Sequence, residues 1–200
     1  SRGLGDVYKR QVMNRLRKNS KKKSSYASNK IEGNPLSEKQ VDEVIERDER
    51  KHYLKPEQEV RNYFLALNYL EEKVSKKEKF SQKLILDVQK LVEKGASKEK
   101  IGLRGSMPPG VLFAVYDSKT GNPDYIPPEY CDIPELLDEL VEYVNTTDDH
   151  PLIVAAVVHY QLVTIHPFED GNGRTARLLS GYIMLSLIHI SEPTRQEAIS

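Results

Sequence analysis

Apolar residues recur every three or four positions along most of this chain, which is the period of amphipathic helices. Two such stripes, in the segments that begin at Pro56 and Ser81, contain Val60, Phe64, Leu67 and Val74, and Leu84, Val88, Leu91 and Val92. A third helix is predicted after Asp132, because Asp132 and Glu135 have the spacing of a capping box. Residues 152–165 form a fourth, apolar segment. Stripes of this kind indicate core positions, not cofactor sites.

A different pattern separates the second and third helical segments. Residues 111–116 form a short apolar run with β propensity, and the turn-forming cluster DSKTGNPD follows at 117–124. This arrangement predicts a β-hairpin, which on the pattern alone is either an ordinary connection or a functional element. With the helices, it gives the predicted fold class: mainly α, a helical bundle with a small β-hairpin.

The composition is that of one globular domain and limits the classes of partner. With 200 residues and 38% hydrophobic content, the chain can bury one sizeable core. Its net charge of zero excludes a general attraction to nucleic acid, and the basic run at 15–23 is predicted to be a solvated tail. The lone Cys131 excludes an internal disulfide. Because no apolar run of about 20 residues and no signal peptide are evident, we expect no membrane partner and a cytoplasmic location.

The candidate chemistry is concentrated in the run HPFEDGNGRTAR, residues 166–177. His166 follows the apolar segment at a helix end, where an imidazole can act as a general base near neutral pH, and Pro167 ends the helix. Asp170 offers a hard oxygen ligand for Mg²⁺, an ion that often binds one or two carboxylates and completes its shell with water and phosphate oxygens. A base and a metal ligand four positions apart indicate chemistry on a phosphate.

The second half of the run predicts an anion-binding turn. Gly171, Asn172 and Gly173 permit backbone angles that direct successive amides into one concavity. A helix is predicted from Arg174 onward, so its unpaired first-turn amides would face the same anion. Arg174 and Arg177 lie three positions apart and therefore on one helix face. Each residue taken singly also fits an ordinary packed loop, but such a loop does not need a carboxylate, a glycine-rich turn and two arginines together.

This run resembles the signature of the Fic family, and residues 166–177 meet every fixed position of that signature. The resemblance implies a Fic-like helical bundle and an enzyme that transfers AMP from ATP to a protein hydroxyl and releases pyrophosphate. It implies that His166 is the catalytic base, that Asp170 holds Mg²⁺ and that Phe168 anchors the loop in the core. The implied nucleotide-binding residues are Gly171, Asn172, Gly173, Arg174 and Arg177.

A second segment, SNKIEG at residues 28–33, resembles the inhibitory motif of the same family. Ser28 and Glu32 lie four positions apart and share one face of a short helix near residues 24–34, and Gly33 follows them. By resemblance, Glu32 pairs with Arg177 and keeps that guanidinium from the γ-phosphate. The implied state is autoinhibited, with the inhibitory helix N-terminal to the catalytic loop in the same chain.

The predicted hairpin, placed near residues 104–128, resembles the flap of the family. Such a flap adds the backbone of a target peptide to an exposed strand edge and so brings the target hydroxyl to His166. The implied partners are ATP and a protein with a Ser, Thr or Tyr acceptor, and the sequence leaves a homo-oligomer open.

Several alternatives to AMP transfer stay open on the sequence. The same site could remove AMP, transfer another nucleotide or transfer a phosphoryl group, although Gly173 argues against the phosphorylating relatives, which tend to carry lysine there. A non-catalytic regulatory module that binds nucleotide or a protein partner is the remaining alternative, and the intact His166 and Asp170 argue against it.

The two ends of the chain are predicted to be foreign to the domain. Residues 1–11 and 185–195 are consistent with translation of opposite strands of one DNA sequence, an inverted repeat that resembles a sequencing-library adapter of the tagmentation type. We therefore place the Fic-like domain at residues 12–184, cut short at its C-terminus, and treat 1–11 and 185–200 as tails without function.

Overall fold

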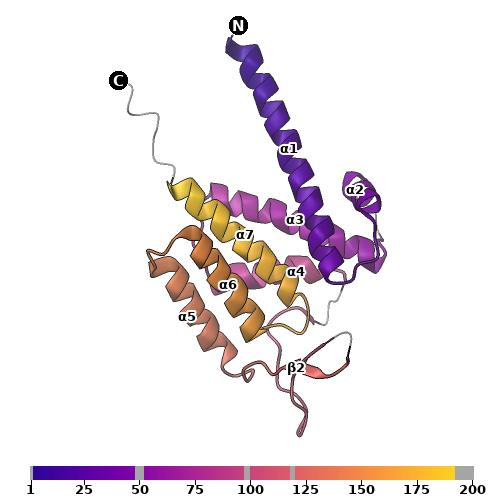
Figure 1. Ribbon diagram of the computed structural model, residues 1–200, viewed down its shortest axis with the longest axis vertical. Helices are drawn as coiled ribbons and strands as arrows, with labels where there is room; N and C mark the ends of the chain where they lie inside the picture. The colour runs from indigo at the N-terminus through magenta and orange to yellow at the C-terminus, as the bar shows by residue number, and fades with distance from the viewer. Residues whose placement is uncertain (1, 48–51, 97–99, 118–119, 192–200) are drawn as a thin grey trace.

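The computed structural model describes residues 2–47, 52–96, 100–117 and 120–191 (Figure 1). Its elements follow in the order α1 (Arg2–Ile31), α2 (Glu38–Glu46), α3 (Lys55–Ser75), α4 (Gln82–Glu93), β1 (Val115–Tyr116), β2 (Pro123–Tyr125), α5 (Ile133–Thr146), α6 (Pro151–Ile165) and α7 (Asn172–Ser191). Over these residues the fold is mainly helical with a small two-stranded antiparallel sheet, which confirms the predicted fold class.

The predicted start of α4 at Ser81 is confirmed, whereas the predicted cap of α5 is not. Ser81 caps α4, because its hydroxyl oxygen accepts a hydrogen bond from the Leu84 N–H. The capping box predicted at Asp132 and Glu135 is wrong. The Asp132 N–H donates to the Glu129 carbonyl oxygen, and this turn already gives Asp132 helical backbone angles. An N-cap residue needs an extended backbone for its side chain to reach the helix amides, so the Asp132 side chain makes no capping bond.

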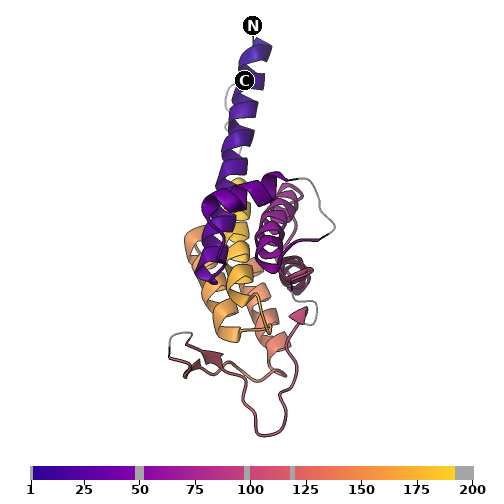
Figure 2. The same cartoon turned by 90° about the vertical axis from the view of Figure 1, so that its right-hand side faces the viewer.

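The hairpin is shorter than the sequence predicts. Val115 pairs with Tyr125 and Tyr116 with Pro123, while residues 111–114 are not strand. Of the predicted turn cluster, residues 118–119 lie outside the described part of the chain. Figure 2 shows the hairpin at the end of the molecule opposite the start of α1, beside the end of α6 that carries the candidate base.

The N-terminal half of α1 projects beyond the bundle, and its described side chains at 7–20 are exposed (Figures 1 and 2). The basic run at 15–23 is part of this helix and not an irregular tail; its side chains at 15–20 are solvated as predicted, whereas Lys21 and Lys22 are partly buried. The Lys22 ammonium lies 2.7 Å from Glu46 Oε1 on α2, and the Lys21 ammonium lies 2.6 Å from Glu71 Oε2 on α3. These ion pairs fix the second half of α1 to its neighbours.

The two predicted tails are only partly described. Residues 2–11 belong to α1 and residues 185–191 belong to α7, whereas residue 1 and residues 192–200 lie outside the described part of the chain. Their predicted foreign origin stays a prediction.

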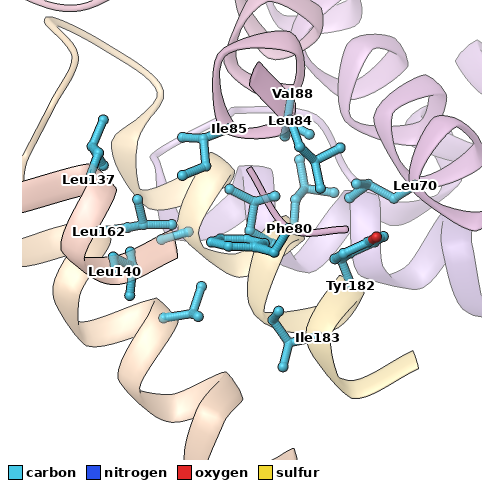
Figure 3. Close-up of a cluster of buried hydrophobic side chains, with 14 of the residues drawn as sticks. Leu70, Phe80, Leu84, Ile85, Val88, Leu137, Leu140, Leu162, Tyr182 and Ile183 are labelled. Carbon is cyan, nitrogen blue, oxygen red and sulfur yellow. The ribbon is translucent and has the colours of Figure 1, made fainter. Parts of the chain in front are cut away.

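The core lies between α6 and α7, with α3, α4 and α5 packed around that pair. Phe80 lies among side chains from several helices, and Figure 3 labels Leu84, Ile85, Leu140, Leu162, Tyr182 and Ile183 around it. The α4 stripe is confirmed for Leu84, Val88 and Val92, which are all buried. On α3 the buried hydrophobic side chains are Val60, Tyr63, Ala66 and Leu70, so three of the four differ from the predicted stripe.

Helix α6 is apolar on all sides, yet only one face is core. Val154, Val158 and Leu162 are buried, whereas Leu152 and Tyr160 are exposed. Among the helices that the structure describes, none has the length and apolar content needed to cross a membrane.

Candidate functional site

His166 ends α6 in a left-handed backbone conformation, with φ 49° and ψ 57°. Its N–H donates to the Leu162 carbonyl oxygen, and its half-buried ring lies 5.9 Å from the Phe113 ring, centroid to centroid. Burial lowers the pKa of the imidazole below its usual value. The ring is therefore neutral at pH 7. A proton on Nδ1 would face the Val163 carbonyl oxygen, 3.4 Å away, and would leave Nε2 as the basic atom.

The loop after His166 is anchored in the core by Phe168, which is buried as expected. The side-chain amide of Asn172 bridges the backbone of this residue: its oxygen accepts from Phe168 N–H at 3.0 Å and its nitrogen donates to Phe168 O at 2.8 Å. Leu103 pairs with Phe168 from the segment before the hairpin. Asn172 thus shapes the loop with its side chain, so any contact that it makes with an anion falls to its backbone amide.

The glycines of the loop serve different purposes. Gly171 has a positive φ of 78°, and a Cβ atom there would also lie 2.6 Å from the Glu93 carboxylate. Gly173 lies inside α7 and has no positive φ, so the expected special backbone angle is absent. A larger residue would not fit at position 173, because a Cβ atom there would lie 2.5 Å from Glu32 Oε1 and 3.0 Å from an Arg177 nitrogen.

The first turn of α7 leaves backbone donors at the loop. The Thr175 N–H donates to the Gly171 carbonyl oxygen at 2.9 Å, so by helix geometry the amides of Asn172, Gly173 and Arg174 have no carbonyl within the helix to bond. These amides and the positive end of the helix dipole favour an anion at this position.

Arg174 lies at the bottom of the loop and is 5% exposed. One terminal nitrogen donates to Glu93 Oε1 at 2.8 Å and lies 3.3 Å from Asp170 Oδ1. Within the described residues, its Nε and its other terminal nitrogen are buried without an acceptor. Buried donors of this kind are costly unless a partner reaches them, and a phosphate oxygen is a suitable partner.

Asp170 is the expected metal ligand, and its carboxylate is held among positive groups. It lies 3.2 Å from the Lys100 ammonium and accepts from the Gly171 N–H at 2.7 Å. Burial alone would raise the pKa of this carboxyl, but Gly171, Lys100 and Arg174 together lower it. No cluster of three or more His, Cys, Asp or Glu suited to a metal occurs in the described part of the chain. A single carboxylate matches a Mg²⁺ ion that takes its other ligands from phosphates and water.

Arg177 contacts the end of α1 and not the loop. Its Nε donates to Ser28 Oγ at 2.8 Å, and a terminal nitrogen lies 2.5 Å from Glu32 Oε1 and 3.2 Å from the Ser28 carbonyl oxygen. The two arginines therefore have separate partners in this structure: Arg174 turns to Glu93 and Asp170, whereas Arg177 is occupied by α1.

The motif at residues 28–33 forms the last turn of the 30-residue helix α1, not a short separate helix. Gly33, with φ 83°, ends the helix: its N–H donates to Lys30 O and the Asn34 N–H donates to Asn29 O. This pattern is a Schellman motif. It places Glu32 at the helix end, directly beside Arg177.

Two buried charged residues of the site, Glu93 and Arg104, were not predicted. Glu93 follows Gln89 by four positions on the buried face of α4 and is 1% exposed. A carboxylate on a core stripe signals a buried cationic partner, and here that partner is Arg174. Arg104 stands between apolar Leu103 and Gly105 in a β-prone segment, but this local signal does not identify its partners.

Comparison with known proteins gives the family. A model described as the Fic/DOC family matches residues 79–184, more than half of the chain. Protein adenylyltransferase fic-1 of Caenorhabditis elegans is 48% identical over 63 residues, 30% of this chain and 12% of that protein. Protein adenylyltransferase Fic of Nematostella vectensis is 43% identical over 65 residues, 31% of this chain and 15% of that protein. The chain thus spans about an eighth of the length of the curated relatives it matches.

Solved structures agree with this assignment. A Fic family protein from Desulfovibrio desulfuricans superimposes with a TM-score of 0.73 at 26% identity, over 92% of this chain and 53% of that one. A fragment of Fic-1 from Caenorhabditis elegans gives 0.64 at 32% identity, over 80% and 46% of the two chains. With the loop at 166–177 built on a helical bundle of this shape, the chain belongs to the Fic/DOC family.

Proposed function

We propose that this chain is a Mg²⁺-dependent protein adenylyltransferase that transfers AMP from ATP to a Ser, Thr or Tyr hydroxyl of a target protein, and that it is held inactive by its own α1. One observation carries the proposal. Ser28 and Glu32 at the end of α1 both contact Arg177, on the helix whose first turn presents free amides beside the neutral His166.

The proposed reaction has a simple balance of bonds and protons. His166 takes the proton of the acceptor hydroxyl, whose oxygen attacks the α-phosphorus of ATP. The bond from that phosphorus to the bridging oxygen breaks, and pyrophosphate leaves with the electron pair. A neutral imidazole is required for the first step, and the lowered pKa of His166 supports this role.

The loop offers hydrogen-bond donors and a metal ligand for the phosphates of ATP. The amides of Asn172, Gly173 and Arg174 offer donors for phosphate oxygens. The two unpartnered nitrogens of Arg174 are buried, so they become donors for a phosphate only when the Arg174 side chain moves. Asp170 would hold Mg²⁺ with those oxygens, and the ion would neutralise negative charge that develops on them. The fit rests on the donor set: one carboxylate beside anion-binding amides.

Inhibition follows from the occupation of Arg177 by α1. While Ser28 and Glu32 hold this guanidinium, it cannot also bind a terminal phosphate, and the Glu32 carboxylate adds negative charge where a phosphate would lie. Removal of the carboxylate should therefore allow productive ATP binding.

The test is AMP transfer from α-labelled ATP with Mg²⁺, with the chain itself and added cell proteins as acceptors. We expect label on protein with Glu32→Gly, little with the unaltered chain, and none with Glu32→Gly combined with His166→Ala. Circular dichroism and ATP titration of all three proteins control for folding and for nucleotide binding.

Two results would contradict the proposal. Label from γ-labelled but not α-labelled ATP would indicate phosphoryl transfer instead. A folded Glu32→Gly variant that binds ATP and transfers no label to any acceptor would favour a non-catalytic nucleotide-binding module.

A further inference from the structure

Arg104 is a buried cation that contacts neither the loop anion site nor α1. It lies in the segment before the hairpin and is 5% exposed. Burial lowers the pKa of its guanidinium, and no carboxylate pairs with it among the hydrogen bonds and ion pairs of the described residues. The charge of Glu129 offsets part of the cost of burial, but it forms no ion pair with the guanidinium, so the bonds of Arg104 to neutral groups need a reason.

Those bonds converge on the turn that carries His166. Nε donates to the His166 carbonyl oxygen at 2.8 Å, and a terminal nitrogen lies 3.5 Å from the Ile165 carbonyl oxygen. The backbone N–H of Arg104 donates to Pro167 O at 2.9 Å. Three successive carbonyls at the end of α6 therefore have Arg104 as a partner. Helix ends leave such carbonyls unpaired, and a cation is favoured there.

The turn needs this support because its geometry is unfavourable. His166 has φ 49°, a left-handed conformation that is unfavourable for a residue other than glycine. Such a conformation persists only where the surroundings over-determine it. The arginine side chain and the ordinary bond from His166 N–H to Leu162 O supply that constraint from opposite sides of the residue.

The same guanidinium reaches the hairpin region. A terminal nitrogen donates to Pro128 O at 2.5 Å, after β2, and the guanidinium carbon lies 4.6 Å from the centre of the Phe113 ring, before β1. The Phe113 ring also contacts the candidate base, because its centroid lies 5.9 Å from that of the His166 ring. Arg104 thus touches both ends of the hairpin segment and the backbone of the candidate base.

We infer that Arg104 is a positioning residue: it locks the left-handed turn at His166 and fixes the base relative to the hairpin. The role rests on the proposed function for its effect on rate, but its effect on backbone conformation does not. Its absence should leave ATP binding unchanged, because none of its bonds goes to residues 170–177.

The test uses Arg104→Met, which keeps much of the side-chain volume and removes all side-chain donors while leaving the backbone bond to Pro167 O, and Arg104→Lys, which keeps the charge. NMR of isotope-labelled protein reports the φ of His166 through its HN–Hα coupling and intra-residue nuclear Overhauser effect. We expect Arg104→Met to lose the left-handed signature and Arg104→Lys to retain it in part. Tyr125→Phe is the matched control, since it removes only the bond from β2 to Thr164 O and should leave the signature intact.

Kinetics in the Glu32→Gly background provide the second readout. A displaced base should lower kcat roughly 10²-fold with Arg104→Met, while the KM for ATP changes less than about threefold. Arg104→Lys should recover part of the kcat.

The two readouts separate the possible failures. If Arg104→Met leaves the left-handed NMR signature of His166 fully unchanged, the inference is overturned. Should the methionine variant not fold, Arg104→Lys takes its place, and a fully unchanged signature overturns the inference in the same way. A raised KM for ATP with unchanged kcat would also overturn it. If Glu32→Gly itself transfers no AMP, the proposed function fails, and the NMR result alone still decides the role of Arg104.

Discussion

Gly173 allows Glu32 to approach Arg177, because glycine has no side chain at the place that the Glu32 carboxylate occupies. The glycine is the second residue of α7 and has no positive φ, so its backbone conformation does not require glycine. Its presence therefore needs a spatial reason, and the 2.5 Å from its would-be Cβ atom to Glu32 Oε1 supplies one.

We predict that Gly173→Ala raises AMP transfer by pushing Glu32 away from Arg177. The pair is partly exposed, so its loss is worth about 1 kcal/mol and the gain is roughly fivefold, below that of Glu32→Gly. The measurement is the initial rate of label transfer. Gly181→Ala, where a Cβ atom meets nothing within 4 Å on the same helix, should leave the rate unchanged. If Gly173→Ala lowers the rate equally in the unaltered chain and in the Glu32→Gly variant, the added methyl group obstructs the backbone amides proposed to bind phosphate, and the prediction is wrong.

A second prediction concerns the pH dependence of the reaction. Because burial lowers the pKa of His166, the base stays neutral to lower pH than an exposed histidine of pKa 6.5. The acid limb of kcat/KM in the Glu32→Gly variant should therefore lie below pH 6.5. The Glu32 carboxylate raises this pKa, so its removal moves the limb further down. An acid limb above pH 6.5 would count against His166 as the base.

The lowered pKa of His166 also predicts how the stability of the fold changes with pH. As pH falls through 6.5, the unfolded chain takes up a proton at this histidine before the folded chain does. The His166 contribution therefore destabilises the fold on acidification, over the range from pH 6.5 down to the folded-state pKa. His166→Ala should remove this contribution from a plot of unfolding free energy against pH.

Helix α1 has two halves with different relations to the bundle. The described side chains at 7–20 are exposed, whereas Ser25, Ser28 and Asn29 are buried against the bundle. Near the boundary of the two halves, Lys18 and Lys22 contact Glu46, and Lys21 contacts Glu71. The helix is thus held in place from its middle to its end, which is the part that brings Ser28 and Glu32 to Arg177.

Truncation should separate these halves. Deletion of residues 1–11 is expected to leave the melting temperature unchanged, because their described side chains contact no core. Deletion of residues 1–23 removes the lysine contacts and should lower it by several degrees, at about 2–4 °C per kcal/mol for a chain of this size. Thermal unfolding followed by circular dichroism checks both, and an equal loss in the two truncations would contradict this division of α1.

The molecule as a whole is organised by the α6–α7 pair, which holds the loop at residues 166–171 between two helices that share one core. His166 ends the first helix and Asn172 begins the second, so the geometry of the loop depends on how the pair packs. Loss of core packing should therefore affect the site and the stability together.

We predict that Leu162→Ala lowers the free energy of unfolding by about 2–5 kcal/mol, because this side chain is 1% exposed and its removal leaves a cavity. Leu152→Ala on the same helix, at 58% exposure, should cost no more than about 0.5 kcal/mol. Urea denaturation measures both changes. Similar costs for the two variants would mean that the buried face of α6 has been wrongly identified.

Much of this picture could be read from local spacing. The helical stripes, the turn at residues 171–173 and the pairing of a base with a carboxylate four positions later all depend on neighbours in the chain, and local periodicity predicts such features. The stripe of α3 was predicted in part: Val60 is buried and Leu67 and Val74 pack against the core, but the other buried positions depend on which neighbour the helix packs against. The predicted cap of α5 was wrong, because the turn at Glu129 begins before the helix.

The amino-acid sequence was sufficient for the fold class and the candidate loop, and the link from Glu32 to Arg177 came from a family resemblance. The pairing of Glu93 with Arg174, the clamp of Arg104 on the His166 turn and the contact between Glu32 and the space at Gly173 join residues that lie far apart in the chain. Spacing along a helix says which side chains share a face, but the partner of a buried charge depends on which faces pack together. That choice is made by the fit of apolar surfaces across the whole bundle.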